Sequence, residues 1–468
     1  MSINFENLPG PKGLPIIGNL HQVTISEMNK NFENWASEYG EVYKVILGPT
    51  KFTIVSKPEI IHQLLKARPS KFRRLSKMDN ILREQGVNGV FNAEGEDWKM
   101  HRKIVTKGLD LKHQQQFFPS MVTTVEKLYK KMVIASKLNQ NYDIQDDLTR
   151  FTVDITTSLA FGFEMNTLEK KGGVIQEHME KIFPMIFKRI NEPIPFYKFY
   201  KTKKDKEYDI AMNAIEKQVD EFIENTREKL KKNPELNEKP SNFLESILVA
   251  SVEEKMFTNL EIKGNLLTLM LAGEDTTAHS LSWIIYFLCQ NPDVQTKIQQ
   301  EVDTILTTDN YLKEYSNHSD FIYIEAVINE SLRLKSVAPL LLLEPLEDIE
   351  IENYLFKKET KIVALTHFAS LTEDYFSDSE TFNPDRWLEK KEIPSKCPMH
   401  NEDAFMPFGF GPRFCPGKNL AILEMKVVLS MILKNFTIEM VTPISQIKEI
   451  MAFALMPSKF EVRLIKRK

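Results

Sequence analysis

The sequence predicts a mainly α-helical protein with a small β-rich lobe, and two observations support that prediction. From about residue 57 to residue 335, apolar residues recur with the 3.6-residue period of amphipathic helices. Alternating apolar and polar residues, which are typical of strands, occur at about 39–56 and 339–371. Because the early and late strands are expected to pair with each other, we predict a single domain over 1–468, with helices making up the remainder.

The sequence predicts the following elements. Residues 8–19 are rich in proline and glycine, so they form an extended lead-in rather than a helix. A hairpin follows, with its turn at Gly48-Pro49. A long buried helix of roughly 25 residues is expected around 266–283, and the last two strands are expected within 435–466. The clearest amphipathic helices are predicted at 121–136, 210–232, 291–306 and 417–433.

Composition and charge limit the classes of function. The net charge of −4 gives no sign of nucleic-acid binding. No signal peptide opens the sequence, and no apolar run reaches the roughly 18–20 residues that span a bilayer. Three cysteines, Cys289, Cys397 and Cys415, cannot form a disulfide framework and favour a reducing compartment. We therefore expect a cytoplasmic monomer.

Residues 408–417, FGFGPRFCPG, frame one cysteine with glycines, a proline and an arginine. Cys415 lies just before a predicted helix, whose unpaired N–H groups and dipole would lower the pKa of its thiol. Gly411 and Gly417 permit close approach of a flat ligand, and Arg413 can bind a carboxylate. These features describe a haem held by its iron and a carboxylate. Taken alone, a buried structural cysteine or a catalytic thiol is also compatible with them.

Polar residues interrupt the long apolar helix in the stretch LAGEDTTAHS, residues 271–280. Such a cluster is costly in a buried helix, so it indicates a functional site, although a partly exposed helix would also tolerate it. An acid beside an alcohol can relay protons. In EAVINESLRLK (325–335), Glu330 and Arg333 are spaced to pair on one helix; a surface ion pair is the alternative.

FGFGPRFCPG resembles the haem-binding loop of the cytochrome P-450 family, Phe-x-x-Gly-x-Arg-x-Cys-x-Gly, at every fixed position. The resemblance implies the cytochrome P-450 fold, with a long central helix over a buried haem b. It implies that Cys415 is the axial thiolate on the iron, that Arg413 contacts a haem propionate, and that Phe408 packs near the sulfur. Gly417 is the last fixed position of the motif.

Other motifs resemble the same family in the same order along the chain. The polar stretch resembles its oxygen-activation motif, which implies that Asp275 and Thr276 deliver protons for the activation of dioxygen. Ala272 and Gly273 would line the space above the iron. The resemblance further implies a buried network of Glu330, Arg333 and Arg386. WKMHR (98–102) resembles a motif in which Trp98 and Arg102 bind propionates; His101 is expected to be exposed.

Two positions depart from the family pattern. Leu343 stands where many relatives carry an arginine for a propionate, which places more of the haem anchoring on Arg413, Trp98 and Arg102. Glu359 stands where glycine is usual, and the sequence gives no functional reason for it. A histidine-ligated haem is the rival arrangement, but no histidine has a frame comparable to that of Cys415.

The expected activity is that of a haem-thiolate monooxygenase acting on a lipophilic substrate such as a fatty acid, terpenoid or steroid. Peroxide-driven or isomerase and dehydratase chemistry, and a non-catalytic haem sensor or carrier, are the alternatives. Electrons would come from a separate ferredoxin, flavodoxin or reductase. This chain would bind the electron donor through a basic docking face that includes Lys99, Arg102, Lys103, Lys107, Lys418 and Lys426. Apolar substrate contacts are expected in 78–91, 181–200, 336–343 and 451–455.

Overall fold

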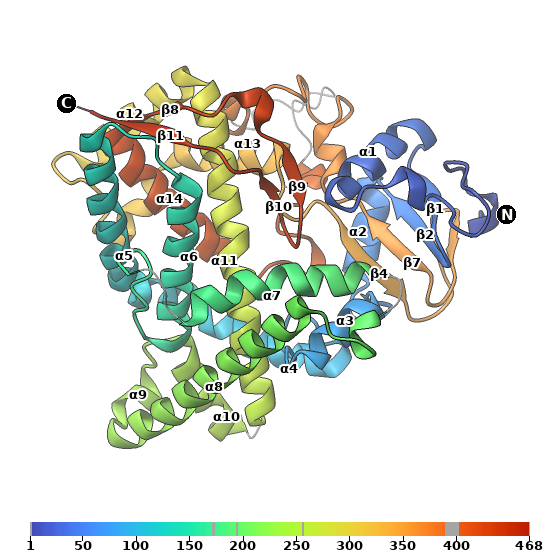
Figure 1. The fold of residues 1–468 in the computed structure, drawn as a ribbon, viewed down its shortest axis with the longest axis horizontal. Helices are drawn as coiled ribbons and strands as arrows, with labels where there is room; N and C mark the ends of the chain where they lie inside the picture. The colour runs from blue at the N-terminus through green and yellow to red at the C-terminus, as the bar shows by residue number, and fades with distance from the viewer. Residues whose placement is uncertain (1, 171–173, 193–194, 255–256, 389–401, 468) are drawn as a thin grey trace.

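A computed structural model describes residues 2–170, 174–192, 195–254, 257–388 and 402–467. Helices fill most of it, and α11 (Asn259–Gln290) runs through the middle of the molecule (Figure 1). The structure thus confirms the predicted fold class, a mainly helical chain with a small β-rich lobe. Cys397 lies outside the described residues.

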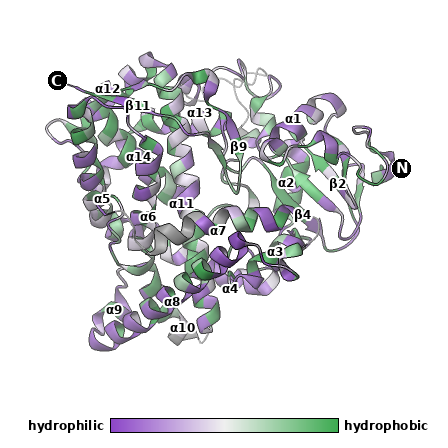
Figure 2. Ribbon diagram, in the orientation of Figure 1, coloured by the Kyte–Doolittle hydropathy of each residue, from purple (hydrophilic) through white to green (hydrophobic). Residues whose placement is uncertain are grey.

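The helices follow the predicted amphipathic segments. In α5 (Leu111–Leu138), for example, hydrophobic residues are interspersed with hydrophilic ones (Figure 2), and one face is buried. Besides α5 and α11, the α-helices of the described residues are α1 (Met28–Tyr39), α2 (Pro58–Lys66), α3 (Ser76–Glu84), α4 (Gly95–Gly108), α6 (Ile144–Phe161), α7 (Val174–Asn191), α8 (Lys203–Lys232), α9 (Glu235–Glu238), α10 (Phe243–Glu254), α12 (Pro292–Leu306), α13 (Ile322–Leu334) and α14 (Lys418–Asn435).

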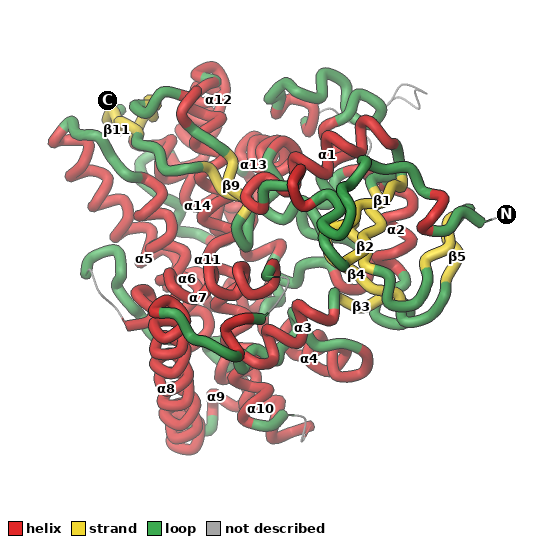
Figure 3. Tube along the Cα trace, turned by 45° about the vertical axis from the view of Figure 1, so that its right-hand side comes forward, coloured by secondary structure: helices red, strands yellow, loops and turns green. Residues whose placement is uncertain are grey.

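The β-rich lobe lies near the N-terminus, to one side of the helices (Figure 3). Its five-stranded sheet has the order β1-β2-β7-β4-β3, in which only β2 and β7 are parallel. The pairing of β2 with β7 confirms that early and late strands meet. The strands are β1 (Val42–Leu47), β2 (Thr50–Val55), β3 (Phe72–Arg74), β4 (Leu341–Pro345), β5 (Ile349–Ile351), β6 (Tyr354–Phe356), β7 (Lys361–Ala364), β8 (Phe436–Met440), β9 (Glu449–Met451), β10 (Leu455–Pro457) and β11 (Val462–Lys466).

The strands and turns confirm two predictions from the sequence and add two details. The hairpin turns at Gly48-Pro49 as expected, and β8 pairs with β11 within 435–466. β3 was not predicted, because three residues carry too little alternation to be recognised. Glu359 has a φ of +63°, a left-handed conformation that favours glycine, which explains why a glycine is usual there.

α11 is longer than the roughly 25 residues expected, and it remains helical through the polar stretch. Its start is fixed by a capping box between Thr258 and Glu261. The main hydrophobic core surrounds α11 and includes buried residues of α5, α6 and α14. The helix is therefore held from several sides, which fixes the residues that it presents to the site. No helix of the described residues has the length and apolarity needed to cross a bilayer.

Candidate functional site

The cysteine loop, residues 408–417, immediately precedes α14. Gly409 and Gly411 have φ values of +73° and +71°, which favour glycine. A Cβ on Gly411 would lie 2.6 Å from the carbonyl oxygen of Leu65, so the loop packs too closely for a side chain there. The N–H of Cys415 donates to the carbonyl of Phe408 (2.8 Å), which folds the loop back on itself.

The sulfur of Cys415 accepts hydrogen bonds from the backbone N–H groups of Gly417 and Lys418 at the start of α14. These donors and the charge of Arg102 lower the pKa of the thiol, as the sequence predicts, but burial raises it by more. The pKa therefore lies above its ordinary value, which corrects the sequence-based expectation. A bound metal ion would reverse this balance, because a coordinating thiol is deprotonated.

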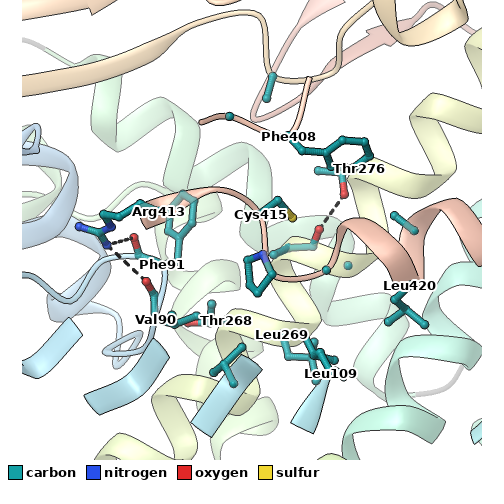
Figure 4. A pocket seen from close by; sticks show the side chains of 18 of the residues that line it. Val90, Phe91, Leu109, Thr268, Leu269, Thr276, Phe408, Arg413, Cys415 and Leu420 are labelled. Carbon is teal, nitrogen blue, oxygen red and sulfur yellow. Dashed lines mark hydrogen bonds between the residues drawn. The ribbon is translucent and has the colours of Figure 1, made fainter. Parts of the chain in front are cut away.

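A cavity of about 290 Å³ lies beside the sulfur, within reach of α4, α11, α14 and the cysteine loop (Figure 4). Every predicted site residue except Asp275 lines it. These residues are Trp98, Arg102, Ala272, Gly273, Thr276, Phe408, Arg413, Cys415 and Gly417. Apart from a few polar groups the walls are apolar, as in most small-molecule sites.

Thr276 and Asp275 are neighbours in sequence but differ in their surroundings. The Thr276 hydroxyl donates to the carbonyl of Ala272 at 2.7 Å (Figure 4). Asp275 is absent from the described residues that line the cavity, since successive helical residues project about 100° apart. Burial raises the pKa of its carboxyl to about 6, so it can exchange protons near neutral pH.

Arg413, Trp98 and Arg102 are brought together as the sequence predicts. The Arg413 guanidinium lies 5.2 Å from the centre of the Trp98 ring, and it donates to the carbonyls of Val90 and Phe91 (Figure 4). It also pairs with Glu94 at 2.5 Å, while Arg102 donates to the carbonyl of Phe414 at 2.7 Å. The three side chains form part of one wall of the cavity.

Glu330, Arg333 and Arg386 form the predicted buried network, and the surface-pair alternative is wrong for this pair. Arg333 donates two hydrogen bonds to Glu330, at 2.9 and 2.8 Å, and Arg386 donates a third at 3.1 Å. All three side chains are buried. The network ties α13 to the segment around Arg386.

Two expectations about polar helix residues are wrong. His101 is only 1% exposed and lies between α4 and α11. Its ring nitrogen Nδ1 is 2.7 Å from the side-chain amide nitrogen of Asn265. Lys426 is 3% exposed and pairs with Glu325 at 2.5 Å, so it cannot belong to an exposed docking face. In both cases a polar partner on another helix compensates the burial.

Sequence reasoning missed Glu424, which lines the cavity from α14. It is 3% exposed, its Oε2 has no hydrogen-bond partner, and no other described residue lining the cavity has a carboxyl group. Burial raises its pKa to about 8. On the sequence it is one polar residue of an amphipathic helix, and no pattern distinguishes it from an exposed glutamate.

The raised pKa of Glu424 predicts a pH-dependent stability. The folded protein holds this proton at a pH where the unfolded chain has lost it, so stability falls as pH rises from about 4.5 to about 8. Glu424→Gln removes that contribution, which changes by about 1.4 kcal/mol per pH unit in this range. The melting temperature of Glu424→Gln, relative to that of the wild type, should therefore increase between pH 6 and pH 8. A difference independent of pH would contradict a neutral Glu424.

Comparison with known proteins identifies the family. The Cytochrome P450 family model matches residues 8–464. A putative cytochrome P450, CYP13A7 of Caenorhabditis elegans, is 27% identical over 93% of this chain and 89% of its own length. The probable cytochrome P450 516B1 of Dictyostelium discoideum is 26% identical, covering 92% and 88%, and the mitochondrial 1,25-dihydroxyvitamin D(3) 24-hydroxylase of Mus musculus is 26% identical, covering 93% and 84%. The fold and the cysteine-centred cavity thus define a haem-thiolate protein, and the chain belongs to the cytochrome P450 family.

As a member of this family the protein is a monooxygenase that uses haem. The residues of the cavity fit that cofactor. Two backbone N–H groups point at the sulfur of Cys415, which suits a negatively charged metal ligand. The Nε and Nη2 atoms of the buried Arg68, which also lines the cavity, lack hydrogen-bond partners and suit a carboxylate. A flat apolar ligand with acidic edges matches these features.

Proposed function

We propose that the enzyme hydroxylates or epoxidises a lipophilic molecule, such as a fatty acid, a terpenoid or a steroid, using dioxygen and two electrons. The observation that carries this proposal is the placement of Cys415 and Thr276 on the same largely apolar cavity. The cavity walls would orient the substrate by excluding water from its apolar surface. Val90 and Phe91 from the segment 78–91 line it, together with Val337, Ala338 and Leu341 from 336–343; none of the described residues of 181–200 or 451–455 does.

Each functional side chain would have one role. Cys415 would hold the cofactor through its sulfur, with negative charge stabilised by the N–H groups at the start of α14. Arg413, Trp98 and Arg102 would bind the carboxylates of the cofactor. Bound haem supplies the redox-active iron that this chemistry requires.

Proton supply would depend on α11. Thr276 presents a hydroxyl to the cavity while its proton is held by the carbonyl of Ala272. Asp275, with a pKa of about 6, would reload that hydroxyl through water. Gly273 leaves the helix surface flat, and a Cβ there would meet the Thr156 hydroxyl on α6 at 3.1 Å.

Electrons would come from NAD(P)H through a separate ferredoxin, flavodoxin or reductase. Exposed lysines on α4 and at the start of α14 support a basic docking face, without the buried Lys426. These are Lys99, Lys103, Lys107 and Lys418. A cytoplasmic location, a monomeric state and a single domain stay predictions.

The proposal is tested by turnover with a redox partner under ¹⁸O₂, using wild type and Thr276→Ala. The wild type should place one labelled oxygen atom in the product. Thr276→Ala should lower the product formed per NAD(P)H consumed by about 10-fold or more, because the hydroxyl that passes the proton is lost. Thr276→Ser should restore coupling.

Thr296→Ala is the matched control. The hydroxyl of Thr296 on α12 also donates to the carbonyl four residues earlier (Pro292, 2.9 Å), but Thr296 is not among the described residues that line the cavity. This variant should leave coupling unchanged. Full coupling in Thr276→Ala would contradict the role of Thr276 in proton delivery. Product formed by the wild type without NAD(P)H or without the label would instead favour peroxide-driven or isomerase chemistry.

A further inference from the structure

Three buried or half-buried arginines line the cavity, and one of them lies on β3, the strand that pairs with the Leu343 strand β4. Arg68, which follows α2, and Arg74 on β3 line the cavity together with Arg413 of the cysteine loop. Arg68 and Arg74 belong to none of the motifs described in the sequence. Arg74 lies directly opposite Leu343 in the antiparallel register of β3 and β4, so the two side chains share one face of the sheet.

Few negative charges compensate this cluster. The carboxylate of Glu94 is 2.5 Å from Arg413, only within 3.9 Å of Arg68, and it accepts the backbone N–H of Arg74 at 2.9 Å. Asp79 adds a weaker attraction but pairs with Arg83 at 2.9 Å. Among the residues that the structure describes, the three guanidinium groups thus share one close carboxylate, Glu94, which leaves about two positive charges uncompensated.

The environment makes this excess costly. Arg68 is 4% exposed, and its Nε and Nη2 have no hydrogen-bond partner. Burial, followed by repulsion from Arg74 and Arg413, lowers the pKa of Arg68. Arg74 donates through Nε to the carbonyl of Phe91 at 3.1 Å, and its pKa is lowered to about 10, mainly by burial. A buried cation without a counterion is unfavourable, so the cluster suits a bound anion.

We propose that Arg74, supported by Arg68, binds a carboxylate of the haem and takes the place of the arginine that Leu343 lacks. Haem carries two carboxylates, and these would balance the uncompensated positive charges of the arginines. Leu343 is buried in the core of the β-rich lobe and does not line the cavity, whereas the longer Arg74 reaches it from the neighbouring strand. This inference rests on the proposed function, because it presumes that the cavity binds haem.

The test measures the rate of haem loss from the holoenzyme to an excess of a haem-scavenging protein, followed by the Soret band. Arg74→Leu should lose haem about 10–100-fold faster, as expected for removal of a charged hydrogen bond. The double variant Arg74→Leu with Leu343→Arg returns a guanidinium to the same register pair from β4 and should recover most of the wild-type rate. Arg74→Lys keeps the charge but not the fork and should be intermediate, which provides a variant if Arg74→Leu fails to fold.

Arg227→Leu is the charge-matched control, since Arg227 on α8 pairs with Glu224 on the surface. Its haem loss should equal that of the wild type. A purely structural Arg74 would leave the propionate-bending bands of the resonance Raman spectrum in place, whereas carboxylate binding predicts that Arg74→Leu shifts them and that the double variant shifts them back.

Haem loss within twofold of the wild type in Arg74→Leu, with unchanged propionate bands, would overturn the proposal. Failure of the proposed function is a separate result. It would be seen in the wild type as a ferrous–carbon monoxide spectrum without the strongly red-shifted Soret band of thiolate ligation, whatever the Arg74 variants show.

Discussion

Cys415→Ser should abolish the strongly red-shifted Soret band of the reduced, carbon monoxide-bound protein. Serine is nearly the same size, so the loop of residues 408–417 can keep its fold. Its oxygen, however, is a harder donor than sulfur and stays protonated at neutral pH, so it cannot replace a thiolate. Only the thiolate donates the electron density that favours oxygen–oxygen bond cleavage. Product formation should therefore fall by more than the roughly 10–100-fold expected when a residue that merely supports a metal ligand is lost.

Cys289→Ser is the control for this experiment. Cys289 lies at the end of α11, away from the described lining of the cavity, and burial raises the pKa of its thiol to about 12. Removing it should leave the red-shifted band and the turnover intact. Retention of the band in Cys415→Ser, or its loss in Cys289→Ser, would show that the sulfur ligand has been assigned to the wrong residue.

The local parts of this site could be predicted from sequence because each motif is short and self-contained. The cysteine loop fixes Gly411, Arg413 and Cys415 within a few residues, and their relative placement follows from one tight turn. The same holds for Trp98 and Arg102, one turn apart on α4. These residues, apart from Gly411, line one cavity, as their resemblance to the family motifs implies.

The parts that could not be predicted depend on contacts between distant segments. Arg74 matters because β3 pairs with β4, and nothing near residue 74 reveals that it will face Leu343. His101 and Lys426 lie on amphipathic helices where a polar residue is normally exposed, and their burial depends on partners on other helices. No local sequence pattern reveals Glu424, because its raised pKa arises from desolvation alone.

Glu330→Gln should lower the free energy of unfolding by about 3–5 kcal/mol, because it removes the negative charge from a fully buried network. The carboxylate of Glu330 accepts five hydrogen bonds, which come from the side chains of Arg333 and Arg386, the indole of Trp387 at 2.9 Å and the backbone N–H of Asn383 at 2.9 Å. A glutamine would direct an N–H₂ group at some of these donors and leave two guanidinium groups uncompensated.

Urea unfolding of the holoenzyme, followed by circular dichroism and by the Soret band, measures this loss. The control is Glu224→Gln, whose partner Arg227 is also three residues away but lies on the surface of α8. An exposed pair of this kind contributes little, so the control should change stability by no more than about 0.5 kcal/mol. The hydrogen-bond partners of Glu330 named above do not line the cavity. Glu330→Gln protein that retains haem should therefore keep the thiolate spectrum and its turnover per haem. Equal stability losses in the two variants would mean that burial of the network adds nothing beyond a surface pair. A normal stability with a lost thiolate band would assign Glu330 to the haem site itself.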